Sequence, residues 1–543
     1  MIRPGGLRGR GPERQARRLY SPGMAFESEA RVRSGGVILV LSGLTLALGF
    51  AVQVALAATL GTGREMDVYL VAITLPTLLA VIALTVFPFY LVPALKACAS
   101  AGREADVAIL TRYITRRTAL VALGLVVALE AAAGPIVHVT APGFGADEAR
   151  RAVVLLRIML AGSFFDLLRG VLTAVEYSRE RFFLPQLAPS LNHVVLFASV
   201  LLLLRPFGLV GLAAGWSVGS LVMLVAVLPA LRGLRVLRAG PGPSSVVADS
   251  IRGGLLPIVV VAGLGQLSPV IDRLVASLLS AGSISYLGYG SKLLEILMRT
   301  VPLAAALSAF PVLSGHAARN DRERLGRTAV SSLRLALLGA VPLALTVLAF
   351  RVQFVQVLFQ RGAFDAAATR NVAAACAWYA VAFLPATVAY LLVQVCFALK
   401  QTWFLVAAGA LSVLATAALD LALARWLGFT GIALAFLFVS TIRAIAFGAH
   451  LQTRWRMFNR AEALPFAGQA GVACAAMVAT WAATRTLTRS WVASHTAVWL
   501  VINAGAGAAV FIVVLWVMGN PEARGLAAAV SRKLGVGRPG AGA

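Results

Sequence analysis

Long apolar segments alternate with short polar, arginine-rich segments along most of the chain. A helix that crosses the hydrocarbon core of a bilayer needs about 20 predominantly apolar residues, and fourteen segments reach such a length. Their approximate ranges are 36–60, 68–95, 118–139, 153–176, 184–204, 208–231, 254–280, 285–314, 329–350, 371–399, 402–424, 428–450, 465–484 and 496–518. The pattern predicts an all-α integral membrane protein with about fourteen transmembrane helices.

Ionisable residues interrupt this pattern most clearly in the seventh and eighth segments, which contain Asp272, Arg273, Lys292, Glu295 and Arg299. A charge at bilayer depth costs several kcal/mol unless it meets a partner or a water-filled cavity. Lys292, Glu295 and Arg299 are spaced i, i+3 and i+7 and share one helix face. That face is predicted to line a polar cavity. The alternative is that these groups pair along the helix or extend to the membrane interface.

Composition agrees with a membrane protein. Hydrophobic residues make up 59% of the chain, charged residues 13%, and the mean hydropathy is +0.86, whereas soluble domains contain about 25% charged residues. The formal net charge of +26 lies mainly in loops and tails, not on a folded polar domain, so nucleic-acid binding is not expected. The four cysteines have neither paired nor metal-ligand spacing, so we expect neither disulfides nor a metal site.

The distribution of lysine and arginine predicts the orientation of the helices. About 32 of the 48 basic residues lie in the two tails and in the alternate loops on their side, and about 10 lie in the opposite loops, as the positive-inside rule requires. We therefore expect a multi-pass protein of the bacterial plasma membrane with both termini in the cytoplasm. Residues 1–35, with eight arginines, are predicted to be a disordered tail that contacts anionic headgroups, and residues 519–543 a second basic tail.

The loops opposite the tails do not point to an enzyme. The longest of them, 135–152 and 351–370, are too short to be catalytic domains, and the histidines have no second ligand or triad partner. We interpret all five histidines as residues of the membrane interface near segment ends. They are His138, His193, His316, His450 and His495.

A weak internal repeat divides the chain into two units. Gly63 and Pro93 correspond to Gly282 and Pro311, with offsets of 219 and 218 residues. Parallel repeats require an even number of spans in each unit. Chance similarity between hairpins of like composition is the alternative. The predicted division is a six-helix N-terminal lobe, a six-helix C-terminal lobe and two additional helices, at 36–233, 254–450 and 465–518.

Six stretches of the chain together resemble one family of membrane transporters. They are LGFAVQVALAATLGTGREMDVYLVAITLPTLL (48–79), VTAPGF (139–144), LPQLAPSLN (184–192), VIDRLVASLLSAGSISYLGYGSKLLE (270–295), LFQRGAFDAAAT (358–369) and FALKQT (397–402). In this order they resemble the MurJ (MviN) lipid II flippases of the multidrug/oligosaccharidyl-lipid/polysaccharide exporter superfamily. The resemblance implies a two-lobed fold of fourteen helices and a flippase for a cell-wall precursor. It also implies a cationic central cavity for an undecaprenyl-linked diphosphate and its sugars.

Compared position by position, this chain has only some of the residues that line the family's cavity. Asp67 matches the family's aspartate after the first turn, Lys292 lies where the family has an arginine on the eighth helix, and Glu295 matches the acidic residue one turn later. The family's Arg-Asp pair on the first helix is Val-Gln here, so Gln53 takes the place of a charged residue. Apolar residues replace the family's other first-lobe arginines, at Leu46, Ala80 and Val81.

The lost arginines leave three interpretations open, because arginine grips a diphosphate through a bidentate fork that lysine, valine and alanine lack. In the first interpretation, other arginines supply the missing charge. In the second, the substrate is another polyprenyl-linked glycan. In the third, the chain is a cell-wall scaffold without transport activity. The arginines available inside segments are Arg157, Arg169, Arg273 and Arg299. Two further pairs of charged residues lie inside the segments. Asp166 and Arg169 are predicted to be either a structural pair or a contact in the cavity. Asp420 and Arg443 are predicted to be a buried interhelical pair.

The favoured mechanism is alternating access by rocking of the two lobes, with prolines inside segments as bending sites. The diphosphate is expected to meet Lys292 and neighbouring arginines while the lipid tail stays in the bilayer. No cofactor is expected. Either the membrane potential or a coupling cation or proton at Asp67, Asp272 or Glu295 is expected to drive the cycle. The expected partners are the polyprenyl-diphosphate glycan lipid, membrane lipids and cell-wall synthesis or division proteins, around a monomeric flippase.

Overall fold

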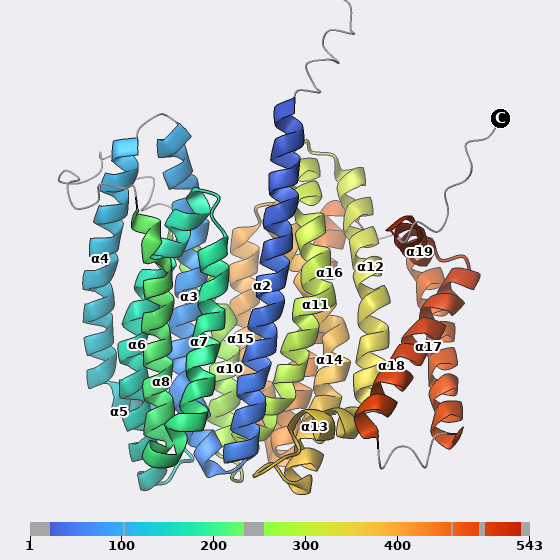
Figure 1. Cartoon of the computed structure of the whole chain (residues 1–543). Coiled ribbons are helices and arrows are strands. Elements are labelled where there is room, and N and C mark those ends of the chain that lie inside the picture. The colour runs from blue at the N-terminus through green and yellow to red at the C-terminus, as the bar shows by residue number, and fades with distance from the viewer. Residues whose placement is uncertain (1–21, 101–103, 233–254, 458–459, 488–494, 534–543) are drawn as a thin grey trace, which may run out of the picture.

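A computed structural model describes residues 22–100, 104–232, 255–457, 460–487 and 495–533, and this part of the chain is helical, without a strand (Figure 1). The elements are α2 (Pro22–Leu60), α3 (Arg64–Ser100), α4 (Glu104–Ala131), α5 (Ala133–Thr140), α6 (Ala146–Ser178), α7 (Phe183–Leu202), α8 (Leu204–Val227), the short 3₁₀ helix η1 (Leu228–Leu231), α10 (Leu255–Ser277), α11 (Ser283–Ala318), α12 (Arg322–Ala349), α13 (Arg351–Phe359), α14 (Ala366–Ala398), α15 (Thr402–Leu427), α16 (Phe429–Trp455), α17 (Arg460–Leu487), α18 (Thr496–Val517) and α19 (Pro521–Lys533).

Long helices lie at the positions of the apolar segments, and this confirms an all-α, multi-pass membrane protein. Eleven described helices are long and apolar enough to cross a membrane, and a twelfth span results if α4 and α5, which meet at a 67° bend, are counted as one. The helix α13 lies in a segment that was expected to be a loop. The disordered tail predicted for residues 1–35 is wrong for 22–35, which form the first turns of α2; residues 1–21 lie outside the described residues.

The helices form two groups and an appendix (Figure 1). Helices α2 to α8 pack mainly with one another and are called the N-lobe here, and α10 to α16 form the C-lobe. Helices α17 and α18 pack together against α12 and α13 at the outer edge of the C-lobe, where Phe350 meets Trp481 and Trp499 edge-on at ring distances of 5.0 and 5.2 Å. The start of α2 and the helix α19 lie at the same end of the bundle, the tail side; the opposite end is the turn side.

The repeated residues occupy equivalent places in the two lobes. Gly63 directly precedes α3 and Gly282 directly precedes α11, and Pro93 and Pro311 lie in the tail-side parts of those helices. Gly282 has a φ of +90°, in the left-handed region where a side chain is strained. Prolines inside spans are tolerated because neighbouring helices satisfy the freed backbone groups. The two long helices α3 and α11 are therefore equivalent: each follows a glycine and has a proline in its tail-side part. Both border the space between the lobes.

Close helix packing in the N-lobe depends on glycines. A Cβ at Gly162 would lie 2.9 Å from the Trp216 ring, and a Cβ at Gly170 would lie 2.9 Å from the backbone carbonyl of Ala83. Small residues allow helix backbones to approach closely inside a membrane, where van der Waals contact is a main source of association. These glycines hold α6 at the centre of the N-lobe, against α8 and α3.

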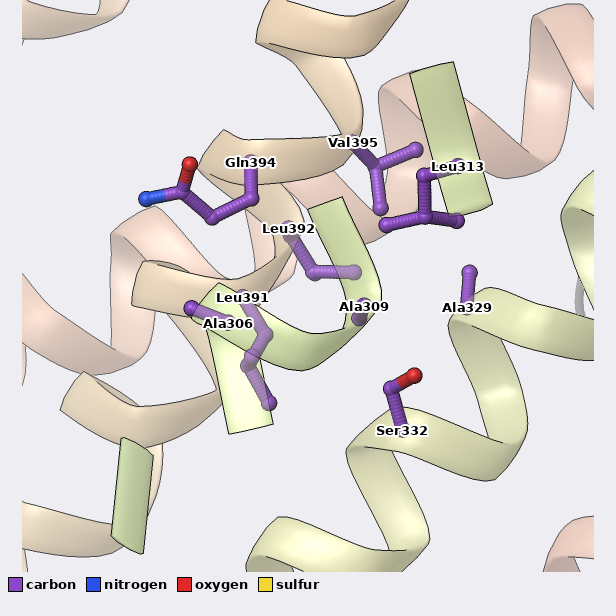
Figure 2. A pocket seen from close by; sticks show the side chains of 9 residues that line it. All are labelled: Ala306, Ala309, Leu313, Ala329, Ser332, Leu391, Leu392, Gln394 and Val395. Atoms are coloured by element: carbon purple, nitrogen blue, oxygen red, sulfur yellow. The ribbon is translucent and has the colours of Figure 1, made fainter. Parts of the chain in front are cut away.

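Figure 2 shows a small pocket among α11, α12 and α14 in the tail-side part of the C-lobe. Its lining is apolar apart from two polar side chains, and that of Gln394 points away from the others. No charged side chain lines it, so we interpret it as a packing gap between three helices and not as an ionic site. The lining residues are Ala306, Ala309, Leu313, Ala329, Ser332, Leu391, Leu392, Gln394 and Val395.

Candidate functional site between the lobes

The two lobes are joined at the turn side by a carboxylate. Asp67 of α3 is 1% exposed, and its Oδ2 and Oδ1 accept hydrogen bonds from the backbone N–H groups of Gly282 (2.7 Å) and Ser285 (2.8 Å). The first N–H groups of a helix have no partner within the helix, and the helix dipole attracts negative charge there. Asp67 thus caps α11 from the other lobe. The Ser285 hydroxyl completes this seam by donating to the carbonyl of Thr62 at 2.9 Å.

Two further backbone contacts close the turn side. The N–H of Ala363 donates to the carbonyl of Ala58 at 2.8 Å, and Gly362, with a φ of +58°, lies directly against the same carbonyl. Gly143 approaches the backbone of Ser277 equally closely and donates to its hydroxyl at 3.3 Å. A Cβ at either glycine would collide with backbone atoms, so both positions require glycine. These contacts keep the lobes together at this end.

Deeper in the membrane, the lobes touch through α3 and the C-lobe helices α10 and α11. Arg273 of α10 donates to the hydroxyl of Thr74 on α3. Leu70, one turn before Thr74, packs on Gly288 of α11. Arg273 is therefore tied to the first lobe, and it serves as an interlobe contact near Asp272.

The polar face of α11 lies next along the helix toward the tail side. The Lys292 Nζ lies 3.0 Å from Glu295 Oε2, and the Arg299 Nη2 lies 2.9 Å from Glu295 Oε1. The side chains of Lys292, Glu295 and Arg299 nevertheless remain 40%, 44% and 63% exposed. The three groups therefore pair along the helix, as one alternative predicted. They also form an exposed face with one net positive charge, as the predicted lining of a polar cavity requires. Its role in binding stays a prediction.

Gln53 lies half-buried on α2, in the first lobe. One turn earlier on the same helix, Gly49 faces the His193 ring of α7. His193 is in the middle of α7. The interpretation of all five histidines as interface residues is therefore wrong for His193. The sequence contained a signal for this, because residue 193 lies near the centre of the predicted segment 184–204.

Most of the other arginines considered for the cavity are engaged elsewhere. Arg169 is 4% exposed and bonds Asp166 Oδ1 through Nε (3.0 Å) and Nη2 (2.7 Å), while Asp166 Oδ2 accepts from the Ser220 hydroxyl at 2.8 Å. This resolves the Asp166–Arg169 pair as a structural one inside the N-lobe. Arg157 lies 3.9 Å from Glu130. Of the four arginines considered, Arg299 belongs to the exposed face of α11.

A second carboxylate group lies inside the C-lobe. Asp420 of α15 is 1% exposed, and neither of its carboxylate oxygens has a hydrogen-bond donor. The predicted Asp420–Arg443 ion pair is therefore wrong. Asp272 of α10 lies close enough to interact with Asp420. Thr416, one turn before Asp420, lies beside Ser268 of α10 at an oxygen–oxygen distance of 3.4 Å. Among the described residues, no group of three or more His, Cys, Asp or Glu side chains could hold a metal ion.

The comparisons with known proteins agree with this two-lobed arrangement. A family model described as lipid II flippase MurJ matches residues 56–502. The chain belongs to the MurJ family of lipid II flippases. It is 28% identical over 363 residues to the lipid II flippase MurJ of Burkholderia cenocepacia, covering 63% of this chain and 69% of that protein. It is 24% identical over 525 residues to a probable lipid II flippase MurJ of Vibrio cholerae, covering 91% and 97%. The resemblance drawn from the six stretches is confirmed.

Solved structures show the same fold. A lipid II flippase MurJ in an inward closed conformation superposes with a TM-score of 0.73 at 18% identity, covering 89% of this chain and 98% of that one. An inward-facing transporter of the MATE multidrug resistance family gives a TM-score of 0.67 at 13% identity, covering 77% and 98%. MurJ family members are membrane transporters, not enzymes.

Proposed function

We propose that this chain translocates lipid II from the cytoplasmic to the outer leaflet for peptidoglycan synthesis, by alternating access between its two lobes. Membership of the MurJ family supports the substrate. The observation that carries the mechanism is the exposed cationic face of α11, which lies toward the tail side of the described contacts between the lobes. Such an arrangement offers a polar site at membrane depth to one side of the bilayer at a time.

The tail side is proposed to be cytoplasmic. The start of α2 and the helix α19 lie there (Figure 1), and the arginine-rich loops on the same side support this orientation through the positive-inside rule. In that orientation the turn-side contacts between the lobes face the outside, and Lys292 and Arg299 lie on the cytoplasmic side of these contacts. The proposed location is the bacterial inner membrane.

The headgroup is proposed to bind through its diphosphate. Lys292 and Arg299 already share Glu295, so they are ordered before the substrate arrives, and the three residues together carry one positive charge. Charge-assisted contacts to phosphate are about twice as strong as neutral hydrogen bonds. The diphosphate would compete with Glu295 for these two cations while the polyprenyl tail remains among the lipid chains.

Complementation tests this function. In a bacterium depleted of its own lipid II flippase, expression of this chain is expected to restore growth and the exposure of lipid II at the outer face. Lys292→Ala is expected to reduce the flipping rate at least tenfold, since it removes a charge-assisted phosphate contact of about 1.5–3 kcal/mol. Arg327→Ala is the matched control, because Arg327 forms a similar i, i+4 pair with Glu323 at 2.9 Å on α12, outside the space between the lobes.

Failure of the unsubstituted chain to rescue growth, with normal insertion, would contradict lipid II as the substrate. It would favour another polyprenyl-diphosphate glycan or a role as a scaffold. Equal activity of the Lys292→Ala and Arg327→Ala variants would leave lipid II as the substrate and remove the α11 face from the mechanism.

We further propose that a monovalent cation between Asp272 and Asp420 energises the cycle. Two carboxyl groups side by side inside a helix bundle repel each other unless a proton or a cation lies between them, and both oxygens of the buried Asp420 are without a donor. In proteoliposomes, an imposed sodium or proton gradient is expected to accelerate flipping, and Asp420→Asn is expected to abolish that acceleration while leaving basal flipping in place. Acceleration by the membrane potential alone, unchanged in Asp420→Asn, would contradict the cation site.

A further inference from the structure

An aromatic cluster lies behind the polar contacts that close the turn side. Tyr289 of α11 packs against Phe359 of α13 and against Phe364, which lies between α13 and α14, at ring distances of 5.2 and 5.4 Å. The rings of Phe359 and Phe364 are themselves 5.8 Å apart. All three side chains are buried, and Tyr289 and Phe364 are each 1% exposed. These three residues of the C-lobe are called the aromatic cluster here.

The aromatic cluster packs directly on the N-lobe. The ring of Phe50 on α2 lies 5.7 Å from the ring of Phe359, so one aromatic pair crosses from lobe to lobe. The cluster also belongs to one buried apolar core together with Leu56 of α2 and Met66 of α3. Aromatic pairs at such distances contribute stability beyond the apolar area that they bury. The aromatic cluster therefore helps to hold the lobes together at the turn side.

One polar atom inside this apolar core has no partner. The hydroxyl of Tyr289 is buried, and no donor or acceptor among the described residues forms a hydrogen bond with it. A buried tyrosine hydroxyl usually finds a partner, and leaving a buried polar group unpaired costs free energy that is recovered when the group is exposed. The polar contacts nearby are satisfied, since Asp67 accepts from two N–H groups and the Ser285 hydroxyl donates to a carbonyl. The Tyr289 hydroxyl is thus an unfavourable group within an otherwise well-matched contact.

We propose that the aromatic cluster is a gate at the turn side, and that the Tyr289 hydroxyl lowers the stability of the closed gate so that the lobes can part. This inference rests on the proposed alternating access and names a residue that sets its equilibrium. Separation of the lobes breaks the Phe50–Phe359 pair and brings Tyr289 to the surface between the lobes, where its hydroxyl gains polar partners. The rings stabilise the closed state and the hydroxyl opposes it, and this balance keeps the closure reversible.

Removal of the hydroxyl alone tests this proposal. Tyr289→Phe keeps the ring contacts, and it is expected to shift the equilibrium toward the closed turn side by about 5- to 150-fold, the range for one unsatisfied buried group. The measurement is the distance between spin labels at the exposed Ala146 and Ala367, in the full-length chain in nanodiscs. It is made in the Asp67→Asn background, where the open state is expected to be well populated, and the population with the longer distance is expected to fall.

A second variant removes the aromatic contact between the lobes. Phe50→Leu keeps an apolar side chain on α2, and it is expected to raise the open population about 2- to 10-fold, as for the loss of one aromatic pair. Phe447→Leu is the matched control, because the Phe447 ring also lies 5.7 Å from its partner, Phe404, and both belong to the C-lobe. Tyr390→Phe is the control for the hydroxyl, since Tyr390 is half-buried among C-lobe residues. Neither control is expected to change the distance between the labels.

The possible outcomes distinguish the gate from the proposed function. An unchanged or larger open population in Tyr289→Phe would overturn the role of the hydroxyl. Equal distances in Phe50→Leu and Phe447→Leu would overturn the role of the aromatic cluster. If no variant, Asp67→Asn included, populates a longer distance, alternating access of these lobes is contradicted together with the gate. If the distances respond as expected in a chain that does not flip lipid II, the gate stands and only the proposed substrate is lost.

Discussion

Replacing Asp67 with asparagine is expected to open the turn side and to reduce flipping strongly. The carboxylate accepts two backbone N–H groups at the start of α11, at 2.7 and 2.8 Å, whereas an asparagine side chain has one acceptor oxygen and an NH₂ group that cannot accept. The loss of one charge-assisted hydrogen bond and of the charge at the helix N-terminus is worth about 2–3 kcal/mol. This corresponds to a shift of about 30- to 150-fold in the ratio of the two conformations.

Distances between the lobes measure this shift. Spin labels at Ala146 and Ala367, which are exposed at the turn-side starts of α6 and α14, report on the separation of the lobes at that end. The Asp67→Asn variant is expected to populate a longer distance than the unsubstituted chain, and its flipping rate is expected to fall in parallel.

Asp365 supplies the matched control within a single lobe. It caps α14 by accepting from the N–H of Ala368 at 2.7 Å, and both residues belong to the C-lobe. Asp365→Asn is expected to lower stability by about 0.5–2 kcal/mol without changing the distance between the lobes. A longer distance in both variants, or in neither, would show that the Asp67 contact does not set the equilibrium.

Replacing Asp166 with alanine is expected to destabilise the N-lobe by about 3–5 kcal/mol, because it leaves the Arg169 guanidinium buried without its partner. Arg169 makes two hydrogen bonds to Asp166 Oδ1, and Ser220 donates to Oδ2, so three contacts to one carboxylate are lost together. The expected result is a lower unfolding temperature of the purified protein and a smaller yield from membranes.

An exposed pair of the same spacing is the control for this prediction. Asp147 and Arg150 are also i, i+3 neighbours on α6, at 2.7 Å, but both are largely exposed, so Asp147→Ala is expected to change the unfolding temperature little. The double variant Asp166→Ala with Arg169→Leu is expected to recover part of the stability, since no unpaired charge then remains. No recovery in the double variant would mean that the lost stability comes from packing and not from the uncompensated cation.

The parts of the candidate site that lie along one helix were predictable from the sequence. The spacing of Lys292, Glu295 and Arg299 places them on one face and within reach of one another, and both pairs are present in the structure. The same holds for Asp166 and Arg169. Helical periodicity alone determines such neighbours, because residues three and four apart always adjoin on a helix.

Contacts between helices were not predictable in the same way. The Asp420–Arg443 pair was inferred from two charges in neighbouring segments, but Asp420 lies beside Asp272 from another helix. His193 was assigned to the interface together with the other histidines, but it lies in the middle of α7 and packs on Gly49 of α2. The rotation and crossing of each helix are set by the packing of glycines and side chains on all its neighbours, and one sequence does not display that packing.

The sequence by itself therefore determined a helical membrane protein, the positions of most of its spans, the family, and the polar face of α11. These follow from hydropathy, helical periodicity and motifs, each of which is local along the chain. Only the tertiary structure decided that Asp67 caps a helix more than two hundred residues away, that Arg169 is unavailable to a substrate, and that Asp420 lies beside Asp272. The reason is physical: a charge inside a membrane is stabilised by whichever partner the helix packing places beside it.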